Sequence, residues 1–133
     1  LTWTEVDSRS AVALRAIWGS SANDIWAVGD MGSIRHATSA TVTKLEVVPS
    51  PTSERLRAVW GSAADDVWAV GDVGTILHYD GKAWTKTAAA FPVGKKPTLY
   101  GVWGSARDDV WIVGDGVALH YTGAKLGDAG GSQ

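Results

Sequence analysis

Three aspartates follow a glycine at equivalent places in a repeated sequence: Asp30, Asp72 and Asp115. Three carboxylates on one rim could bind a cation, or could act as an acid and a base. A Gly-Asp pair is also a turn sequence, because the aspartate side chain can accept hydrogen bonds from backbone N–H groups two residues further on. The same residue in every repeat favours a shared requirement of the fold. We therefore expect the three aspartates to be turn residues, and we keep them as candidate ligand-binding residues.

A second set of carboxylates precedes an apolar run in each repeat. Its members are Asp24, Asp66 and Asp109, beside Asn23, Asp65 and Asp108. Paired carboxylates could ligate calcium, which takes six to eight oxygen ligands, but nothing here has the density of a calcium-binding loop. We therefore expect these residues to cap turns.

Three histidines, His36, His78 and His120, recur at spacings of 42 residues. Three imidazoles could form a zinc site. One histidine in each repeat keeps the rings apart, at more than ~10 Å from one another given the spacing of packed sheets. We expect each histidine to be buried and hydrogen-bonded within its own repeat, with a structural role and no metal.

The chain lacks the short motifs that identify most catalytic sites. It has no Ser-His-Asp signature, no phosphate-binding loop and no HExxH zinc motif. It contains no cysteine, which excludes disulfides, thiolate zinc sites and cysteine catalysis. We expect no enzymatic activity and no cofactor.

Tryptophan is the most unusual component of the chain, with eight in 133 residues. Six of them occupy matched positions in the repeats: Trp18, Trp26, Trp60, Trp68, Trp103 and Trp111. Matched positions indicate packing between repeats, although a tryptophan can also stack against a sugar ring. Trp3 and Trp84 lie outside the matched block. They are the better candidates for exposed, ligand-binding aromatics.

The elements that position these residues come from a block that occurs three times. Residues 14–36 read LRAIWGSSANDIWAVGDMGSIRH, residues 56–78 read LRAVWGSAADDVWAVGDVGTILH, and residues 99–120 read LYGVWGSARDDVWIVGDGVALH. The anchors Trp18, Trp60 and Trp103 are spaced by 42 and 43 residues. A fixed period of this length predicts a repeat architecture, in which each unit buries its apolar faces against its neighbours.

The second repeat predicts four short strands, at residues 56–60, 66–70, 75–79 and 82–87, with Gly61-Ser62 ending the first. Gly-Ser, Gly-Asp and Asp-Gly turns separate them. Four strands in ~42 residues match one blade of a β-propeller. A helical repeat does not fit, because glycine turns interrupt every run and β-branched and aromatic residues dominate.

The strand count predicts three blades and two irregular ends. Residues 1–124 form the expected propeller segment, with blades at 13–48, 55–88 and 98–124. The fourth, outer strands are expected at residues 41–47 and 83–87, with a spare one within residues 1–7 that carries Trp3. Residues 125–133 read as a flexible, glycine-rich tail, so the last blade is expected to lack its fourth strand.

Charge and hydropathy exclude several classes of partner. The net charge is −2, and no basic run exceeds Lys95-Lys96. This argues against nucleic acid and against an anionic membrane surface. No apolar run approaches the ~18 residues of a membrane-spanning helix. We therefore expect no membrane insertion.

The chain resembles the Trp-rich β-propeller repeats of the tectonin and tachylectin kind. The resemblance rests on VW-G-S…DVWAVG…G-T-I-L-H-Y-D-G…W within residues 59–84. The resemblance implies a lectin or a protein-binding platform. It also implies an extracellular or cell-surface location, as in related bacterial proteins. The WD dipeptide of WD-repeat proteins and the Asp-box of sialidase-type propellers are absent.

These observations predict a non-catalytic binding module, either lectin-like for glycans or a protein-interaction scaffold. The links at residues 7–13, 48–55 and 88–98 differ in length and chemistry and share a face with the Gly-Asp turns, so they are where specificity is expected. Three blades do not close a ring, which predicts a homodimer of six blades with exchange of strand 1–6. The alternatives are a nine-bladed trimer, or blades that belong to a longer natural chain.

Overall fold

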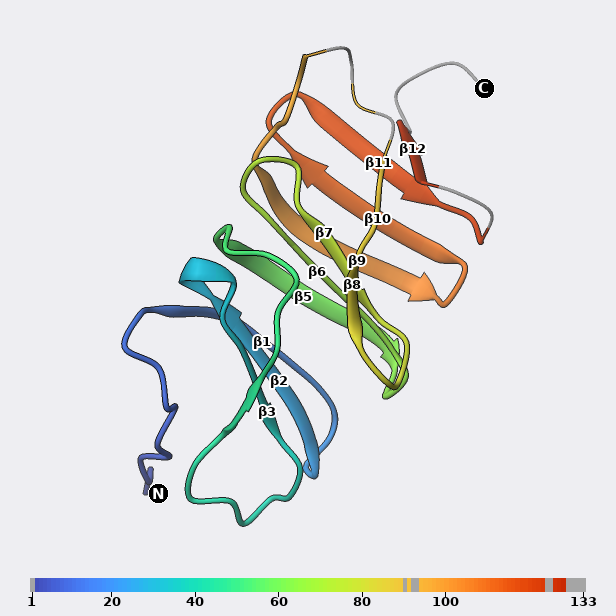
Figure 1. The fold of residues 1–133 in the computed structure, drawn as a ribbon. Coiled ribbons are helices and arrows are strands. Elements are labelled where there is room, and N and C mark those ends of the chain that lie inside the picture. Colours follow the sequence, from blue (N-terminus) through green and yellow to red (C-terminus); the bar gives the residue numbers. More distant parts are fainter. Residues whose placement is uncertain (1, 90, 92–93, 124–125, 129–133) are drawn as a thin grey trace.

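The computed structural model describes residues 2–89, 91, 94–123 and 126–128 of the chain. These residues form three four-stranded antiparallel sheets, each hydrogen-bonded in sequence order, which we call blades 1, 2 and 3 (Figure 1). Blade 1 contains β1 (Leu14–Ser21), β2 (Asp24–Gly29), the 3-10 turn η1 (Asp30–Gly32), β3 (Ile34–Ala37) and β4 (Glu46–Val48). Blade 2 contains β5 (Leu56–Ala63), β6 (Asp66–Gly71), β7 (Ile76–Tyr79) and β8 (Trp84–Lys86). Blade 3 contains β9 (Leu99–Ala106), β10 (Asp109–Gly114), β11 (Val117–Tyr121) and β12 (Leu126–Asp128).

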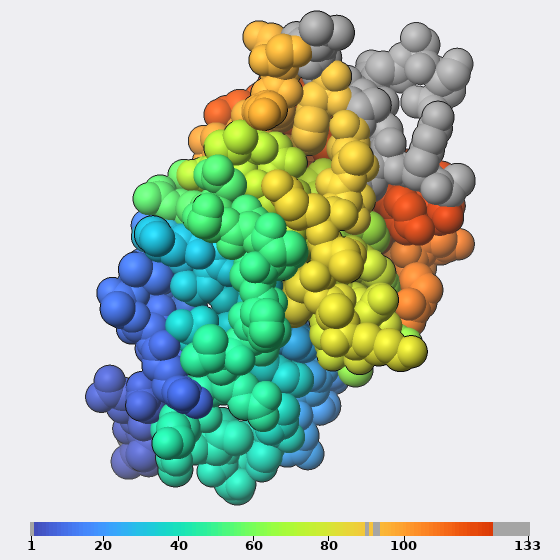
Figure 2. Space-filling model, in the orientation of Figure 1, coloured from blue at the N-terminus to red at the C-terminus, as the bar shows by residue number. Residues whose placement is uncertain are grey.

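The blades pack face to face in sequence order. Their first strands meet most closely, with β1 against β5 and β5 against β9. The sheets fan outward from these first strands, as blades of a propeller do. Figure 2 shows the result as one continuous body in which the colours follow the sequence from blade 1 to blade 3.

Two apolar clusters hold the blades together. Between blades 1 and 2, Trp26 packs with residues of both sheets and has an exposed fraction of 1%. Between blades 2 and 3, Trp68 packs with residues of both sheets and has an exposed fraction of 4%. Burying a tryptophan on an interior sheet face removes a large apolar area from water, so these clusters supply much of the stability of the segment.

The first strand of each blade is longer than the sequence predicted. β5 continues through Gly61 and Ser62 as far as Ala63, and Gly61 pairs with Val67. A Cβ built on Gly61 would lie 2.7 Å from Cη2 of Trp18 in blade 1. The glycine therefore allows the close approach of a tryptophan from the preceding blade and does not end the strand.

Both ends of the chain differ from the prediction. Residues 2–6 form no strand; Asp7 makes one parallel bridge with Lys44 beside blade 1. At the other end β12 pairs antiparallel with β11, with Tyr121 opposite Leu126. The expected flexible tail therefore includes a strand, because a three-residue ladder needs backbone groups and not β-favouring side chains. Because β12 occupies the fourth position of blade 3, that position is not open to an exchanged strand 1–6.

The outer hairpin of blade 2 forms where the Asp-Gly sequence predicted a turn. The Asp80 carboxylate accepts hydrogen bonds from the backbone N–H groups of Lys82 and Ala83 at 2.9 and 3.1 Å, and Gly81 has a φ of 98°. The strand that follows is shorter than expected, at Trp84–Lys86. No helix in the described part of the chain has the length and apolar character needed to cross a membrane.

Candidate functional site

The links between blades and the Gly-Asp turns lie at one end of the molecule, which we call the loop face. Backbone hydrogen bonds tie them together. The N–H groups of Asp30, Asp72 and Asp115 donate to the carbonyl oxygens of Ala13, Arg55 and Thr98, each at 2.9 Å. The three links therefore reach their turns in the same way, and the loop face is built on rigid strands.

The aspartate side chains on this face do not cap their turns. In the first two blades a backbone hydrogen bond closes the turn: the N–H groups of Ser33 and Thr75 donate to the carbonyl oxygens of Asp30 and Asp72, each at 3.1 Å. The carboxylates instead contact the first strand of their own blade, fifteen residues earlier in the chain. The pairs are Arg15 with Asp30, Arg57 with Asp72, and Tyr100 with Asp115.

Two further contacts join these pairs across blades. The Nε of Arg55, from the link before blade 2, lies 2.9 Å from Oδ1 of Asp30 in blade 1. The guanidinium carbon of Arg57 lies 5.2 Å from the ring centroid of Tyr100 in blade 3, within the range of a cation–π contact. The resulting row, which we call the charged rim, contains Arg15, Asp30, Arg55, Arg57, Asp72, Tyr100 and Asp115.

The charges of the rim reinforce one another. The hydrogen bond from Arg15, with help from Arg55, holds the pKa of Asp30 below its usual value. The Asp72 carboxylate in turn raises the pKa of Arg57. Asp30 and Arg57 are therefore ionised at neutral pH, and the rim presents fixed charges on a partly exposed surface.

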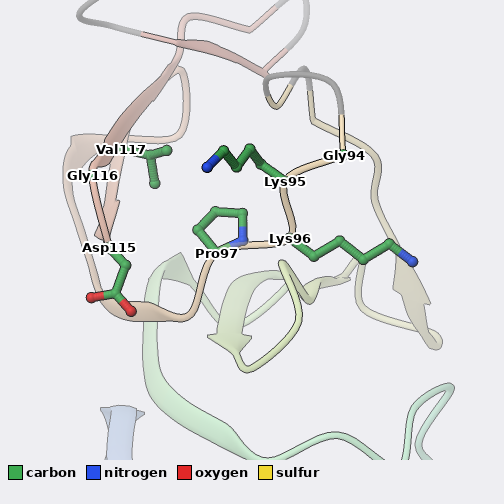
Figure 3. Close-up of a pocket in the computed structure, with 7 residues that line it drawn as sticks. All are labelled: Gly94, Lys95, Lys96, Pro97, Asp115, Gly116 and Val117. Atoms are coloured by element: carbon green, nitrogen blue, oxygen red, sulfur yellow. The ribbon is translucent and has the colours of Figure 1, made fainter.

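A hollow of about 360 Å³ lies at the blade 3 end of the rim. Its lining residues are Gly94, Lys95, Lys96, Pro97, Asp115, Gly116 and Val117 (Figure 3). In Figure 3 the Lys95 side chain extends across the hollow toward Val117, whereas Lys96 points the opposite way. The N–H of Gly74 donates to the carbonyl of Pro97 at 2.8 Å, which anchors this part of the link to blade 2.

Each blade contains a serine, an aspartate and a histidine that are hydrogen-bonded to one another. In blade 1 the Ser20 hydroxyl donates to Asp24, and the other carboxylate oxygen lies 2.7 Å from Nε2 of His36. The His36 ring stacks on Trp26 with centroids 3.8 Å apart. The same groups in the other blades are Ser62, Asp66, His78 and Trp68, and Ser105, Asp109, His120 and Trp111.

The order of these groups differs from that of a Ser-His-Asp catalytic triad. In each cluster the carboxylate lies between the hydroxyl and the imidazole, so the serine hydroxyl is hydrogen-bonded to the aspartate and not to the histidine. The hydroxyl of Ser105, and then His120, lower the pKa of Asp109. The clusters join the first three strands within a blade. The sequence had predicted turn caps for Asp24, Asp66 and Asp109, and that prediction is wrong.

The tryptophans that the sequence singled out differ in their exposure. Trp84 is 6% exposed and packs edge-on against Trp26, so the prediction that it is an exposed aromatic is wrong. Trp3 is 92% exposed. Trp18 and Trp60 are half-buried between blades, whereas Trp103 and Trp111 are exposed. Within the described residues, no group of three or more metal-ligating side chains could hold a metal ion.

The arginines and tyrosine of the rim were missed by the sequence analysis. Arg15, Arg57 and Tyr100 each precede an aspartate by fifteen residues, in every repeat. That constant separation was the available signal. It is harder to see than a repeated residue, because the third repeat has tyrosine in place of arginine.

The comparisons with known proteins support the fold. No protein-family model and no curated protein matches the chain. Solved structures do match it, at low identity, and two of them are of YCF48. A structure described as YCF48 bound to D1 peptide has a TM-score of 0.71 at 12% identity, over 92% of this chain and 42% of that chain. YCF48 from Cyanidioschyzon merolae has a TM-score of 0.64 at 22% identity, over 84% of this chain and 38% of that chain. The chain spans less than half the length of these β-propeller proteins, and its own blades form a β-propeller segment.

Proposed function

We propose that this propeller segment is a non-catalytic binding module that holds a polypeptide on its loop face. The observation that supports this most is the charged rim, which crosses all three blades and joins them through contacts between neighbouring blades. Links of variable sequence on a rigid scaffold are where recognition residues usually lie. The D1 peptide is a ligand of the YCF48 protein, and its presence there favours the same class of partner here.

The rim has the chemistry to bind an extended peptide. Its arginines can give two parallel hydrogen bonds to a carboxylate, and its aspartates can accept from backbone N–H groups or from a lysine. Tyr100 is 51% exposed and offers a flat apolar surface beside Arg57. The hollow next to Lys95 would accept one side chain of the peptide.

Selection from displayed random peptides, followed by fluorescence anisotropy with a labelled hit, tests this proposal. Arg57→Ala should weaken binding by about tenfold or more, as expected for a truncated arginine anchor. The matched control is Arg107→Ala. Arg107 is also paired with an aspartate, Asp65, at 2.7 Å, but in the β9–β10 turn, outside the rim.

The control variant should bind as well as the native chain. Equal losses in the two variants, or a library from which no peptide is enriched, would argue against the loop face as a peptide site.

A lectin-like function is the second candidate, and its support is the resemblance to tectonin-type repeats. Trp3 and Trp103, with exposed fractions of 92% and 62%, are the most exposed aromatic side chains in the described part of the chain and could stack against sugar rings. Asp30, Asp72 and Asp115 could accept hydrogen bonds from sugar hydroxyls. A glycan array measures this directly, and binding that Trp3→Ala abolishes would favour the lectin.

We also propose that two chains associate to give a homodimer of six blades. The support is that the outward faces of blades 1 and 3 carry exposed apolar side chains such as Ile17 and Trp103. The dimer does not depend on strand exchange, because β12 already occupies the fourth position of blade 3.

A further inference from the structure

The outward face of blade 3 is the uncovered counterpart of a face that is covered twice within the chain. Trp103 is 62% exposed and Val113 is 50% exposed. Val28 and Val70, at the place of Val113 in blades 1 and 2, are fully buried. The same sequence pattern is therefore buried wherever a following blade is present.

The two junctions within the chain show what covers this face. A Cβ built on Gly61 would lie 2.7 Å from Cη2 of Trp18, and one built on Gly104 would lie 2.7 Å from Cη2 of Trp60. In each case the tryptophan of one blade lies over a glycine in the first strand of the next. Among the described residues, no glycine lies against the ring of Trp103 in this way.

Blade 1 presents the matching half of this junction. Gly19 is the first-strand glycine of blade 1, and the three atoms nearest to a Cβ built on it all belong to blade 1. Beside it, Ile17 is 70% exposed, whereas Val59 at the same place in blade 2 is 8% exposed. The described residues therefore include both surfaces of a third junction, and both surfaces are exposed in this structure.

We propose that these two surfaces pack against each other between copies, with Trp103 of one chain over Gly19 and Ile17 of the other. The inference rests on the six-bladed homodimer proposed above and names its interface. A two-fold arrangement makes the two new junctions identical, so both apolar faces of each chain are covered at once.

The N-terminal segment limits the new junction to the inner strands. Arg35 stands in β3 where blades 2 and 3 have the buried Leu77 and Leu119. Its Nε and Nη2 donate to the carbonyl oxygens of Ser8 and Arg9 at 3.0 and 2.8 Å. Ser8 and Arg9 therefore cover the outer part of blade 1 at β3 and leave β1 open. The interface is therefore smaller than the internal junctions, and the dimer should dissociate on dilution.

Light scattering on the full 133-residue chain tests the proposal. The native protein should have a mass near twice 14.0 kDa. Trp103→Glu and Ile17→Lys should each weaken the dimer by about 30-fold or more, as for loss of an interface anchor. Both side chains are exposed in the single chain, so circular dichroism of the variants should match the native spectrum. Met31→Glu is the control, because Met31 is 67% exposed but lies in η1 on the loop face.

Mixing the two variants identifies the surfaces. Trp103→Glu retains an intact β1 face and Ile17→Lys retains an intact β9 face, so the mixture should form a heterodimer with one native junction. Its second junction brings the introduced carboxylate next to the introduced ammonium group. No association in the mixture, or a dimer that survives in both single variants, would overturn the interface. A native chain that stays monomeric would overturn the dimer as well, and peptide binding at the loop face would be unaffected by either result.

Discussion

Tryptophans at equivalent positions have different surroundings in the three blades. Trp26 and Trp68 are buried between sheets, with Trp68 at 4% exposure, whereas Trp111 is 39% exposed at the same place in blade 3. The residue type predicts packing in all three cases. The burial depends on whether a neighbouring sheet covers that face.

This difference predicts unequal effects of truncation. Trp68→Ala should lower the free energy of unfolding by about 3–5 kcal/mol, because it leaves a cavity between blades 2 and 3. Trp111→Ala should cost much less in the monomer, since its ring already contacts water. Urea unfolding followed by circular dichroism at a protein concentration that favours the monomer measures both. Equal losses would contradict the assignment of Trp68 to the core.

At the scale of the strands, glycine is needed where two blades approach closely. Gly61 lies under the ring of Trp18, but Gly101, in the corresponding strand of blade 3, has only Cγ2 of Val113 near its Cβ position, at 3.4 Å. Both glycines lie in an inner strand. Only the first has a neighbour that a methyl group would displace.

We expect Gly61→Ala to be destabilising and Gly101→Ala to be neutral or slightly stabilising. The first substitution places a methyl group 2.7 Å from the Trp18 ring and 2.8 Å from the carbonyl oxygen of Asp66. The second reduces the conformational freedom of the unfolded chain at no steric cost. Thermal unfolding of the two variants side by side gives the comparison. A Gly101→Ala variant as unstable as Gly61→Ala would show that backbone conformation and not ring packing selects these glycines.

The β7–β8 hairpin predicts a pH dependence of stability. The N–H groups of Lys82 and Ala83 hold the pKa of Asp80 below its usual value. The unfolded chain therefore binds a proton at higher pH than the folded chain, so this contribution is present above about pH 4 and is lost as pH falls through the folded pKa.

Asp80→Asn separates charge from turn geometry. The amide oxygen can accept the same two hydrogen bonds but does not titrate. The native chain should therefore be more stable than the variant at neutral pH, and the difference should disappear below the folded pKa of Asp80. Urea midpoints across the acid range measure it, and a difference that is constant with pH would exclude the carboxylate as its source.

At the scale of the whole molecule, association should contribute to stability. Only the folded chain offers the outward faces of blades 1 and 3, so the proposed dimerisation would stabilise the folded state by mass action. The thermal midpoint of the native chain should rise over about a hundredfold range of protein concentration, whereas that of Trp103→Glu should stay constant. Midpoints that do not change with concentration in the native chain would contradict this.

Much of the fold follows from local patterns, and the rim shows why the site does not. The Gly-Asp and Asp-Gly turns and the apolar runs predict strands because their chemistry acts within a few residues. The pairing of Arg57 with Asp72, and the position of Arg57 beside Tyr100, depend on register across a sheet and on the approach of another blade. The Ser20–Asp24–His36 cluster was missed for the same reason, since it joins three strands.

The sequence by itself determined the repeat, the four-stranded unit and the face that carries the variable links, because periodicity and turn chemistry are local properties of the chain. Only the tertiary structure decided that Trp84 is buried, that β12 completes blade 3, and that Trp103 faces outward. These properties depend on which surfaces meet. A residue in one repeat has the same sequence context as its equivalents, but its neighbours across the sheet face differ between an internal blade and an outer one.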